Sequence, residues 1–335
     1  MDSNHISRRQ ALKQTFGFSA ALLLGRASLF GQSEGDAEME MSPTASHFTM
    51  IGDWGRHDTM ALQTEVANSM IGYLKEKEIQ PDAMFFLGDN FYGKMNGGVK
   101  SSRFRKQFSE VYPRSSFPGP CYAILGNHEY DDQYKVKIEA QIGYNKSKPG
   151  TRWNMPNKWY RVDFGPKEAP LMTTLFLDSN FKNRRDQLTA EERIEQKAWL
   201  ITELEKPRTA PWLVVNGHHP LYSNGAHGDT PEVIEEWDAL FRKHKVHFYF
   251  CGHDHDLQHL QFEGHPTSFV LSGGGGANIR QQQQDKRDAP FSEAVAGFTH
   301  LEVTTEKCIV RHVNEEGKLL HAFWKKPDGT WRVMG

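Results

Sequence analysis

The chain has 335 residues, of which 38% are hydrophobic and 24% are charged, and its formal net charge is −2. A chain of this length buries enough apolar surface to be held by core packing. Its charge balance shows no basic patch, which argues against nucleic-acid binding as the main function. The three cysteines, Cys121, Cys251 and Cys308, lie in apolar runs. They are expected to be buried thiols rather than a disulfide framework, although one pair could form in an oxidising compartment.

The first predicted element is an export signal at the amino terminus. Residues 7–13, SRRQALK, precede an apolar stretch from Phe16 to Leu24 and resemble a twin-arginine signal in which Ala11 replaces the usual bulky apolar residue. A transmembrane helix needs about 20 apolar residues, and Arg26 interrupts this stretch. We therefore expect a removable signal at 1–33 rather than an uncleaved anchor or a stable membrane span, followed by a polar linker at 34–46. The mature chain would be exported to the periplasm or the extracellular space.

Five short apolar runs follow along the chain, and each ends in a Gly-containing turn that carries polar side chains. They are Phe48–Ile51 before GDWG, Ala83–Leu87 before GDNFY, Tyr122–Leu125 before GNHE, Trp212–Val215 before NGHHP, and Val246–Cys251 before GHDH. Short apolar runs broken by Gly are typical of fully buried strands. In open α/β sheets, ligands bind beyond the carboxyl ends of the strands. The five ends therefore predict one site.

The candidate ligands in these turns are Asp53, Asp89, Tyr92, Asn127, His218, His253 and His255. Each one alone could be an ordinary turn or packing residue, since Gly-Asp is common turn chemistry. Together, carboxylates, an amide oxygen, imidazoles and a phenolate suit iron, manganese or zinc rather than a thiolate site or an all-oxygen calcium site. There are too many for one tetrahedral metal. Two cations that share a carboxylate would use them all and would clamp an in-line phosphoryl displacement.

The ordered set GDWG, GDNFY, GNHE, NGHHP and GHDH resembles the five-block signature of the purple acid phosphatases, a branch of the calcineurin-like metallophosphoesterases. Tyr92, three residues after Asp89, is the discriminating residue, because most metallophosphoesterases outside the purple branch lack a tyrosine ligand there. The resemblance runs from about Phe48 to Lys326. Segments such as Arg152–Pro156 look like the small, single-domain, mammalian-type members, also called tartrate-resistant acid phosphatases.

The resemblance implies a role for each residue of the set. A ferric ion would be bound by Asp53, Tyr92 and His255; Asp89 would bridge it to a divalent iron, zinc or manganese ion completed by Asn127, His218 and His253. Two further histidines, His128 and His227, would lie over the substrate, orient the phosphate and protonate the leaving alkoxide. A metal-bound hydroxide would attack phosphorus in line, so no phosphoenzyme would form. His219 is expected to support or pack beside a ligand.

Helices are expected at 59–77, 101–112, 190–206 and 231–244, and further strands at 268–271, 298–304, 308–313 and 319–324, with a hairpin turn at 314–317. Alternation of elements alone does not exclude a doubly wound sheet. The resemblance implies an α/β (α+β) fold, a four-layer αββα sandwich of two mixed β-sheets flanked by helices, as a single catalytic domain at 47–335. The run Gly273–Gly276 should turn a strand end under the metal site. Residues 180–193 are expected to form an exposed loop that gates the site.

These features predict an exported, monomeric acid phosphatase that hydrolyses phosphate monoesters of small molecules and also of phosphoproteins. Two alternatives stay open. One is a phosphodiesterase or nucleotidase of the same superfamily, against which Tyr92 counts. The other is a redox-active iron protein with peroxidase-like activity. A pure binding role is disfavoured because both His128 and His227 are retained.

Overall fold

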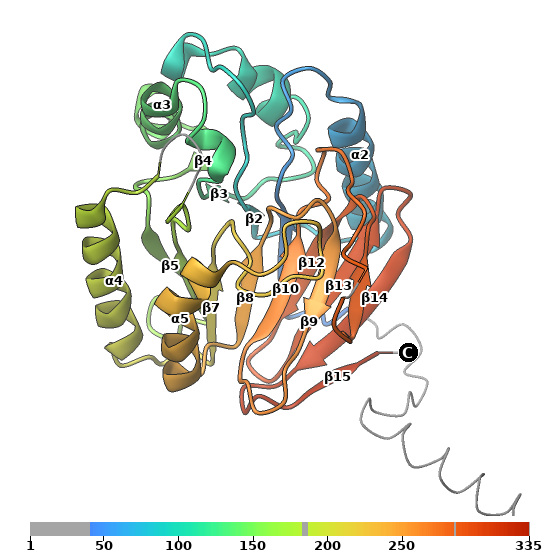
Figure 1. The fold of residues 1–335 in the computed structure, drawn as a ribbon. Helices are drawn as coiled ribbons and strands as arrows, with labels where there is room; N and C mark the ends of the chain where they lie inside the picture. The colour runs from blue at the N-terminus through green and yellow to red at the C-terminus, as the bar shows by residue number, and fades with distance from the viewer. Residues whose placement is uncertain (1–40, 183–186, 285, 335) are drawn as a thin grey trace, which may run out of the picture.

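Two mixed β-sheets lie at the centre of the computed structural model, which describes residues 41–182, 187–284 and 286–334 (Figure 1). One sheet has eight strands in the order β15-β14-β13-β12-β1-β2-β3-β4, with bounds Trp331–Val333, Leu319–Lys325, Cys308–Asn314, Gly297–Val303, Ser46–Ile51, Ala83–Phe86, Cys121–Ala123 and Trp153–Asn154. The other has seven in the order β11-β9-β10-β8-β7-β6-β5, with bounds Phe291–Glu293, Leu257–Leu260, Ser268–Ser272, Phe248–Cys251, Trp212–Asn216, Met172–Phe176 and Tyr160–Phe164. Both sheets are mixed: β1, for example, is parallel to β2 and antiparallel to β12.

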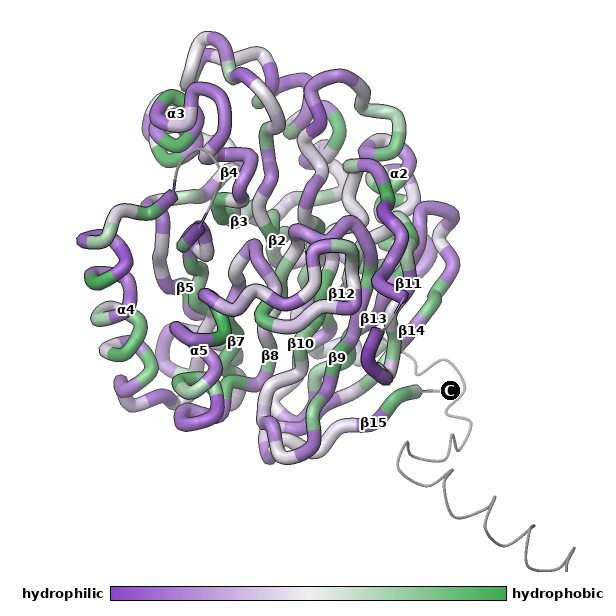
Figure 2. Tube along the Cα trace, viewed as in Figure 1, coloured by the Kyte–Doolittle hydropathy of each residue, from purple (hydrophilic) through white to green (hydrophobic). Residues whose placement is uncertain are grey.

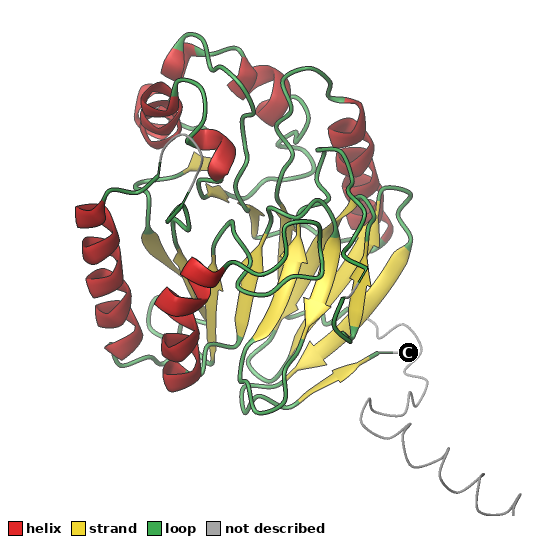
Figure 3. Ribbon diagram, viewed as in Figure 1, coloured by secondary structure: helices red, strands yellow, loops and turns green. Residues whose placement is uncertain are grey.

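Helices cover the outer faces of the two sheets (Figure 3). Helix α2 (Ala61–Glu76) packs on the eight-stranded sheet, while α4 (Ala190–Glu205) and α5 (Pro231–His244) pack on the seven-stranded sheet. Helix α3 (Tyr134–Ser147) and three short helical segments, η1 (Gly98–Lys100), η2 (Phe104–Ser109) and η3 (Asn127–Glu129), lie around the loops. The expected four-layer arrangement with two mixed sheets is confirmed.

Successive side chains of the central strands point to opposite faces of the sheet, and this alternation divides the core into two clusters. In β8, Phe248 and Phe250 face the eight-stranded sheet, whereas Tyr249 and Cys251 pack toward α5. Strand β7 alternates in the same way. This is the period of two expected when both faces of a strand are buried. Hydrophobic residues accordingly gather in the central strands and hydrophilic residues in the loops around them (Figure 2).

Several elements differ from the sequence-based expectation. The helix expected at 101–112 is reduced to the short segment η2. At its end, the N–H of Glu110 donates to the carbonyl of Arg105, five residues earlier in the chain. The guanidinium of Arg103 holds this segment by donating to the carbonyls of Gly55 and Tyr92 at 2.7 Å. Helix α3 was not predicted, because its buried face includes Lys137 and Gln141 and so lacks an apolar period.

Other expectations are confirmed. Helices α2, α4 and α5 lie where the apolar patterns place them, and α4 begins at a capping box formed by Thr189 and Glu192. The turn at 314–317 joins β13 to β14. The three cysteines are free and buried.

No helix in the described part of the chain is long and apolar enough to cross a membrane. The predicted signal at 1–33 and the linker up to residue 40 lie outside the described residues.

Three buried histidines between β9, β13 and β14 predict acid-dependent stability. Burial lowers the pKa of His312 to about 4 and, together with the His312 charge, that of His321 to about 3. Burial also lowers the pKa of His259, whose Nδ1 lies 3.1 Å from Nε2 of His321. Because the unfolded chain binds these protons near pH 6.5 and the folded chain does not, stability should be full above pH 6.5 and fall as the pH drops toward 4.

We expect His321→Phe to reduce this pH dependence. The ring of His321 stacks on Phe291, with centroids 5.0 Å apart, so an aromatic side chain can fill the site. The free energy of unfolding, measured by denaturant titration, should fall about 2 kcal/mol less between pH 7 and pH 5 in the variant than in the wild type. Substitution of the exposed His57 is the control. If the free energy of unfolding depends on pH equally in His321→Phe and in the wild type, the prediction is wrong.

Candidate metal centre

The five polar turns meet at one edge of the sandwich, where the two sheets adjoin. Strands β1, β2 and β3 are parallel in one sheet, and β6, β7 and β8 are parallel in the other, so their carboxyl ends point the same way. Backbone bonds join the turns: the N–H of Asp53 donates to the carbonyl of Gly88 at 3.1 Å, and that of Gly252 donates to the carbonyl of His218 at 3.0 Å. The turns therefore form one connected frame.

Three of the predicted ligands have left-handed backbone conformations. The φ angles of Asp53, Asp89 and His253 are 59°, 51° and 74°. Non-glycine residues rarely adopt this region, and such residues cluster at functional sites. Beside Asp89, Gly88 has φ 90°, and a methyl group there would lie 2.4 Å from Nδ1 of His218. The backbone of these turns is thus locally strained, and this conformation directs the three side chains toward the site.

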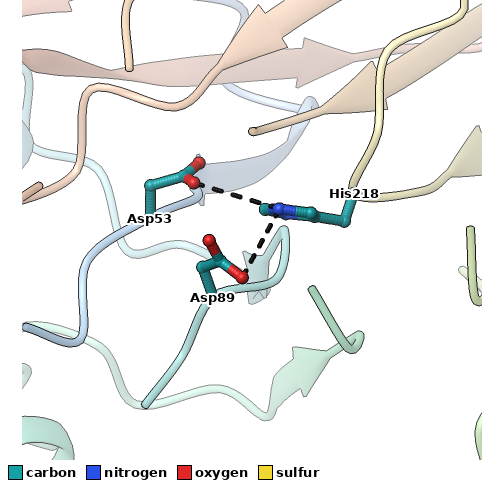
Figure 4. Close-up of side chains that lie close together, drawn as sticks. All are labelled: Asp53, Asp89 and His218. Atoms are coloured by element: carbon teal, nitrogen blue, oxygen red, sulfur yellow. Dashed lines mark ion pairs between the residues drawn. The ribbon is translucent and has the colours of Figure 1, made fainter. Parts of the chain in front are cut away.

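Asp53, Asp89 and His218 form the centre of the site (Figure 4). One donor atom from each lies within 4.8 Å of the other two. Nε2 of His218 is 3.5 Å from Oδ1 of Asp89 and 4.0 Å from Oδ1 of Asp53. All three side chains are buried. Two carboxylates and an imidazole at such distances could hold a cation.

The remaining predicted ligands lie on two sides of this centre. On one side, the hydroxyl of Tyr92 is 3.4 Å from Oδ1 of Asp53 and 3.4 Å from Nε2 of His255. On the other side, Oδ1 of Asn127 is 3.1 Å from Nε2 of His218 and 2.8 Å from Nδ1 of His253. The seven residues are thus brought together in two groups, with Asp53 and Asp89 between them.

The hydrogen bonds of two histidines identify the nitrogen atoms that could bind a metal. Nδ1 of His218 is 2.8 Å from the carbonyl of Leu87, and Nδ1 of His255 is 2.7 Å from the carbonyl of Asn278. Each Nδ1 must carry a proton to make these bonds, so in the neutral ring Nε2 presents a lone pair. Burial lowers the pKa of both rings, that of His255 to about 4. The lone pair of His218 Nε2 therefore faces another acceptor, the amide oxygen of Asn127 at 3.1 Å, an arrangement that a metal ion between them would satisfy.

The charges of the acidic groups lead to the same conclusion. Burial and the neighbouring Asp89 carboxylate raise the pKa of Asp53 well above its usual value. Burial, Asp89 and Asp53 raise the pKa of Tyr92 in the same way. Without a cation, the site would keep protons on these groups. A strongly charged cation would offset the burial and allow both carboxylates and the phenolate to ionise, so the donor set fits a metal centre of the kind that the family resemblance implies.

The two predicted catalytic histidines flank the ligands. The ring of His128 packs against Tyr92 in a tilted arrangement with centroids 4.1 Å apart, and its Nδ1 is 2.8 Å from Asp131. The ring of His227 packs against His253, also tilted, with centroids 4.2 Å apart. Both rings are partly exposed, at 29% and 38% of the side chain. They therefore lie between the buried ligands and the solvent, where a substrate would approach.

Asp254 orients His227 and was not singled out from the sequence. Its buried carboxylate accepts hydrogen bonds from both Nδ1 and the backbone N–H of His227, at 2.8 Å and 2.9 Å. Burial opposes ionisation of Asp254, but bonds from His227 and Ser223 outweigh it and lower its pKa. The only sequence signal was its place between His253 and His255. Asp254 therefore fixes which nitrogen of His227 is free.

Residues after β6 form a further support that the sequence analysis missed. The hydroxyl of Ser179 accepts from the backbone N–H groups of His218 and His219 at 3.1 Å and 2.8 Å. Neighbouring Asp178 is buried and accepts from Tyr130 at 2.6 Å. The signal was present, because Leu171–Leu177 is another apolar run that ends in a polar turn, Asp-Ser-Asn.

Three secondary expectations can be compared with the structure. The ring centroids of His219 and His253 lie 4.4 Å apart, and Nδ1 of His219 forms a hydrogen bond with the hydroxyl of Ser179. Both contacts agree with a supporting role for His219. Gly273 lies under the site, where a methyl group would meet Asp53 and the carbonyl of Asp254. The exposed loop expected at 180–193 is partly wrong, because Phe181 and Leu188 are buried and α4 begins at Ala190. Its centre, 183–186, lies outside the described residues.

We expect Asp254→Asn to reduce turnover about tenfold to a hundredfold by releasing the ring of His227. Metal content should stay unchanged, since Asp254 is not among the predicted ligands. Asp256→Asn is a matched control in the same turn: burial raises the pKa of Asp256 to about 7, so its neutral form is already populated in acid. Equal losses in the two variants would contradict an orienting role for Asp254.

The chain matches a family model described as calcineurin-like phosphoesterase over residues 46–257. Among curated proteins, it is 29% identical to tartrate-resistant acid phosphatase type 5 of Sus scrofa over 296 residues, 82% of this chain and 84% of the relative. It is 31% identical to purple acid phosphatase 4 of Arabidopsis thaliana over 284 residues, 82% of this chain and 81% of the relative.

Solved structures share the fold at lower identity. GAP50 of Plasmodium, described as the anchor in the inner membrane complex, superposes with a TM-score of 0.67 at 20% identity, covering 83% of this chain and 87% of its own. Purple acid phosphatase PPD1 from yellow lupin superposes with a TM-score of 0.64 at 18% identity, covering 85% of this chain and 54% of its own. These likenesses bear on the fold alone.

Proposed function

The chain belongs to the calcineurin-like phosphoesterase family and is a relative of the purple acid phosphatases, and from this premise we propose that it hydrolyses phosphate monoesters in acid at a pair of metal ions. The ferric ion would be held by Asp53, Tyr92 and His255, and a divalent iron, zinc or manganese ion by Asn127, His218 and His253. Asp89 would bridge them. Small phosphorylated molecules are the substrate class, and accessible phosphoproteins are included in the proposal.

One observation carries this proposal. Seven oxygen and nitrogen donors converge in two adjacent groups, and in one of them Nε2 of His218, whose proton is on Nδ1, faces the amide oxygen of Asn127 with no proton between them. A single tetrahedral ion would leave several of these donors unused. Two ions with Asp89 between them use all seven, which supports a dinuclear centre.

The protein's own residues would do the rest of the work. When bound, the metal pair would lower the pKa of water and offset negative charge on the phosphate. His128 and His227, held by Asp131 and Asp254, would orient the ester and give a proton to the leaving oxygen. Each ring packs against a predicted ligand side chain, which would keep both within reach of the same substrate.

The proposal also covers the export of the protein and its organisation as a single domain. We propose that the segment SRRQALK and the apolar stretch after it form a twin-arginine signal, so that the folded, metal-loaded protein is exported. Residues 47–335 would be one catalytic domain that acts as a monomer. Detection of the protein in the periplasm or medium, lost when Arg8 and Arg9 are replaced by Lys, would support this route. Export that persists in the double variant would contradict it.

The enzymatic proposal is tested by comparing two esters of 4-nitrophenol. Purified, metal-loaded protein should release 4-nitrophenol faster from the phosphate monoester than from the bis-ester at mildly acid pH. Removal of metal with a chelator should reduce both rates to background, and iron with zinc should restore them. A preference for the bis-ester, or activity that survives metal removal, would contradict the proposal.

A further inference from the structure

Arg280 lies on a segment that is fixed to the metal centre. After the glycine run, the N–H of Ala277 donates to the carbonyl of Asp53 at 2.7 Å. The carbonyl of Asn278 accepts from Nδ1 of His255 at 2.7 Å, and its side-chain oxygen accepts from Arg56. Arg280 follows two residues later. Its backbone is therefore positioned by the residues that form the site.

The guanidinium of Arg280 contacts the free nitrogen of His227. Nδ1 of His227 is bonded to Asp254, so its proton is on that side and Nε2 is an acceptor. NH1 of Arg280 lies within hydrogen-bond distance of Nε2 and 3.3 Å from Nδ1, so it is close to both ring nitrogens. A guanidinium has no acceptor, so in this contact Arg280 is the donor and His227 the acceptor. Arg280 thus packs against the ring that a substrate oxygen would approach.

No carboxylate pairs with Arg280 among the residues that the structure describes. Nearby cations differ in this respect: Arg56 pairs with Asp58, and Arg287 pairs with Asp229 at 2.7 Å. A guanidinium that has no carboxylate partner among the described residues and borders a phosphate site is suited to bind an anion in a bidentate manner.

We propose that Arg280 is a substrate-binding residue that selects the dianion of a phosphate monoester. Resting on the proposed function, this inference adds a specificity residue to it. When the ester binds, the guanidinium leaves Nε2 of His227 and pairs with non-bridging phosphate oxygens. Nε2 of His227 can then take up a proton from solvent and give it to the leaving oxygen. A diester has one negative charge fewer and one unesterified oxygen fewer than a monoester dianion. It therefore gains less binding energy from Arg280.

The test compares Arg280→Gln and Arg280→Lys with the wild type and with Lys286→Gln. Lys286 is an exposed cation of the same loop that bonds to Gln282 and Ser292, so it controls for the general charge of the rim. Binding of inorganic phosphate to metal-loaded protein is measured by calorimetry, and hydrolysis of the 4-nitrophenyl monoester and bis-ester is measured alongside. Metal content of each variant is determined in the same preparations.

In Arg280→Gln, phosphate binding and kcat/KM for the monoester should fall about tenfold to a hundredfold, mainly through KM, while the bis-ester loses less than about threefold. Arg280→Lys should recover part of the loss, and Lys286→Gln should resemble the wild type. Unchanged phosphate binding in Arg280→Gln, or equal losses for the two esters, would overturn the role of Arg280. If the wild type hydrolyses neither ester, the proposed function fails instead, and phosphate binding still decides the role of Arg280.

Discussion

Asp89→Asn is expected to lose at least about 10³-fold in kcat, together with one or both metal ions. The amide preserves the shape of the side chain and can still accept from the backbone N–H of His128, which lies 2.8 Å from Oδ1. It carries no charge, so it cannot bridge two cations as a carboxylate does. A loss of about 4 kcal/mol in transition-state stabilisation corresponds to this factor.

The measurement combines metal analysis with monoester hydrolysis. Asp238→Asn is the matched control, because Asp238 is a partly buried carboxylate on α5 that pairs with Arg242 and His265 away from the site. We expect the control to keep both metals and its activity. Substantial activity in Asp89→Asn with a full complement of metal would exclude the bridging role.

The double variant His128→Asn, His227→Asn is expected to keep its metals but lose about 10²- to 10⁴-fold in kcat. Neither ring is a predicted ligand, and the backbone of His128 would still bond to Asp89. The variant lacks the groups that orient the phosphate and protonate the leaving oxygen, and removal of such groups has effects of this size. Loss of activity without loss of metal would separate these residues from the ligands.

The control for this variant is His244→Asn. His244 is the last residue of α5, before the amino end of β8, and therefore lies at the opposite edge of the sandwich from the site. Rates and metal content are measured in parallel for both proteins. Near-wild-type turnover in the double variant would show that proton transfer and phosphate orientation come from other groups.

The strand-and-turn pattern predicted the centre of the molecule well because its signal is local. Each of the five motif turns lies next to a buried strand, and the period of two in β7 and β8 reflects burial on both faces. Residues Asp53, Asp89 and His218 therefore meet as expected. Their assignment to particular metal ions stays a prediction.

The residues that support the site were harder to predict because their roles depend on tertiary contacts. Asp254 bonds to His227, which is 27 residues away in the sequence, and Arg280 contacts the same ring from 53 residues away. Neither shows a local pattern that marks it. Helix α3 escaped detection for a related reason: its buried Lys137 donates to the carbonyl of His128, so a polar residue occupies a core position to support the site.

The most direct test of the dinuclear site is the visible absorption spectrum of the purified protein, recorded with metal analysis for the wild type and Tyr92→Phe. Since burial and two carboxylates raise the pKa of Tyr92, its phenolate should exist only when a strongly charged cation binds it. We predict two metal ions per chain, including iron, and a purple charge-transfer band that disappears in Tyr92→Phe. A colourless, fully active wild-type enzyme would contradict the ferric tyrosinate and the metal assignment built on it.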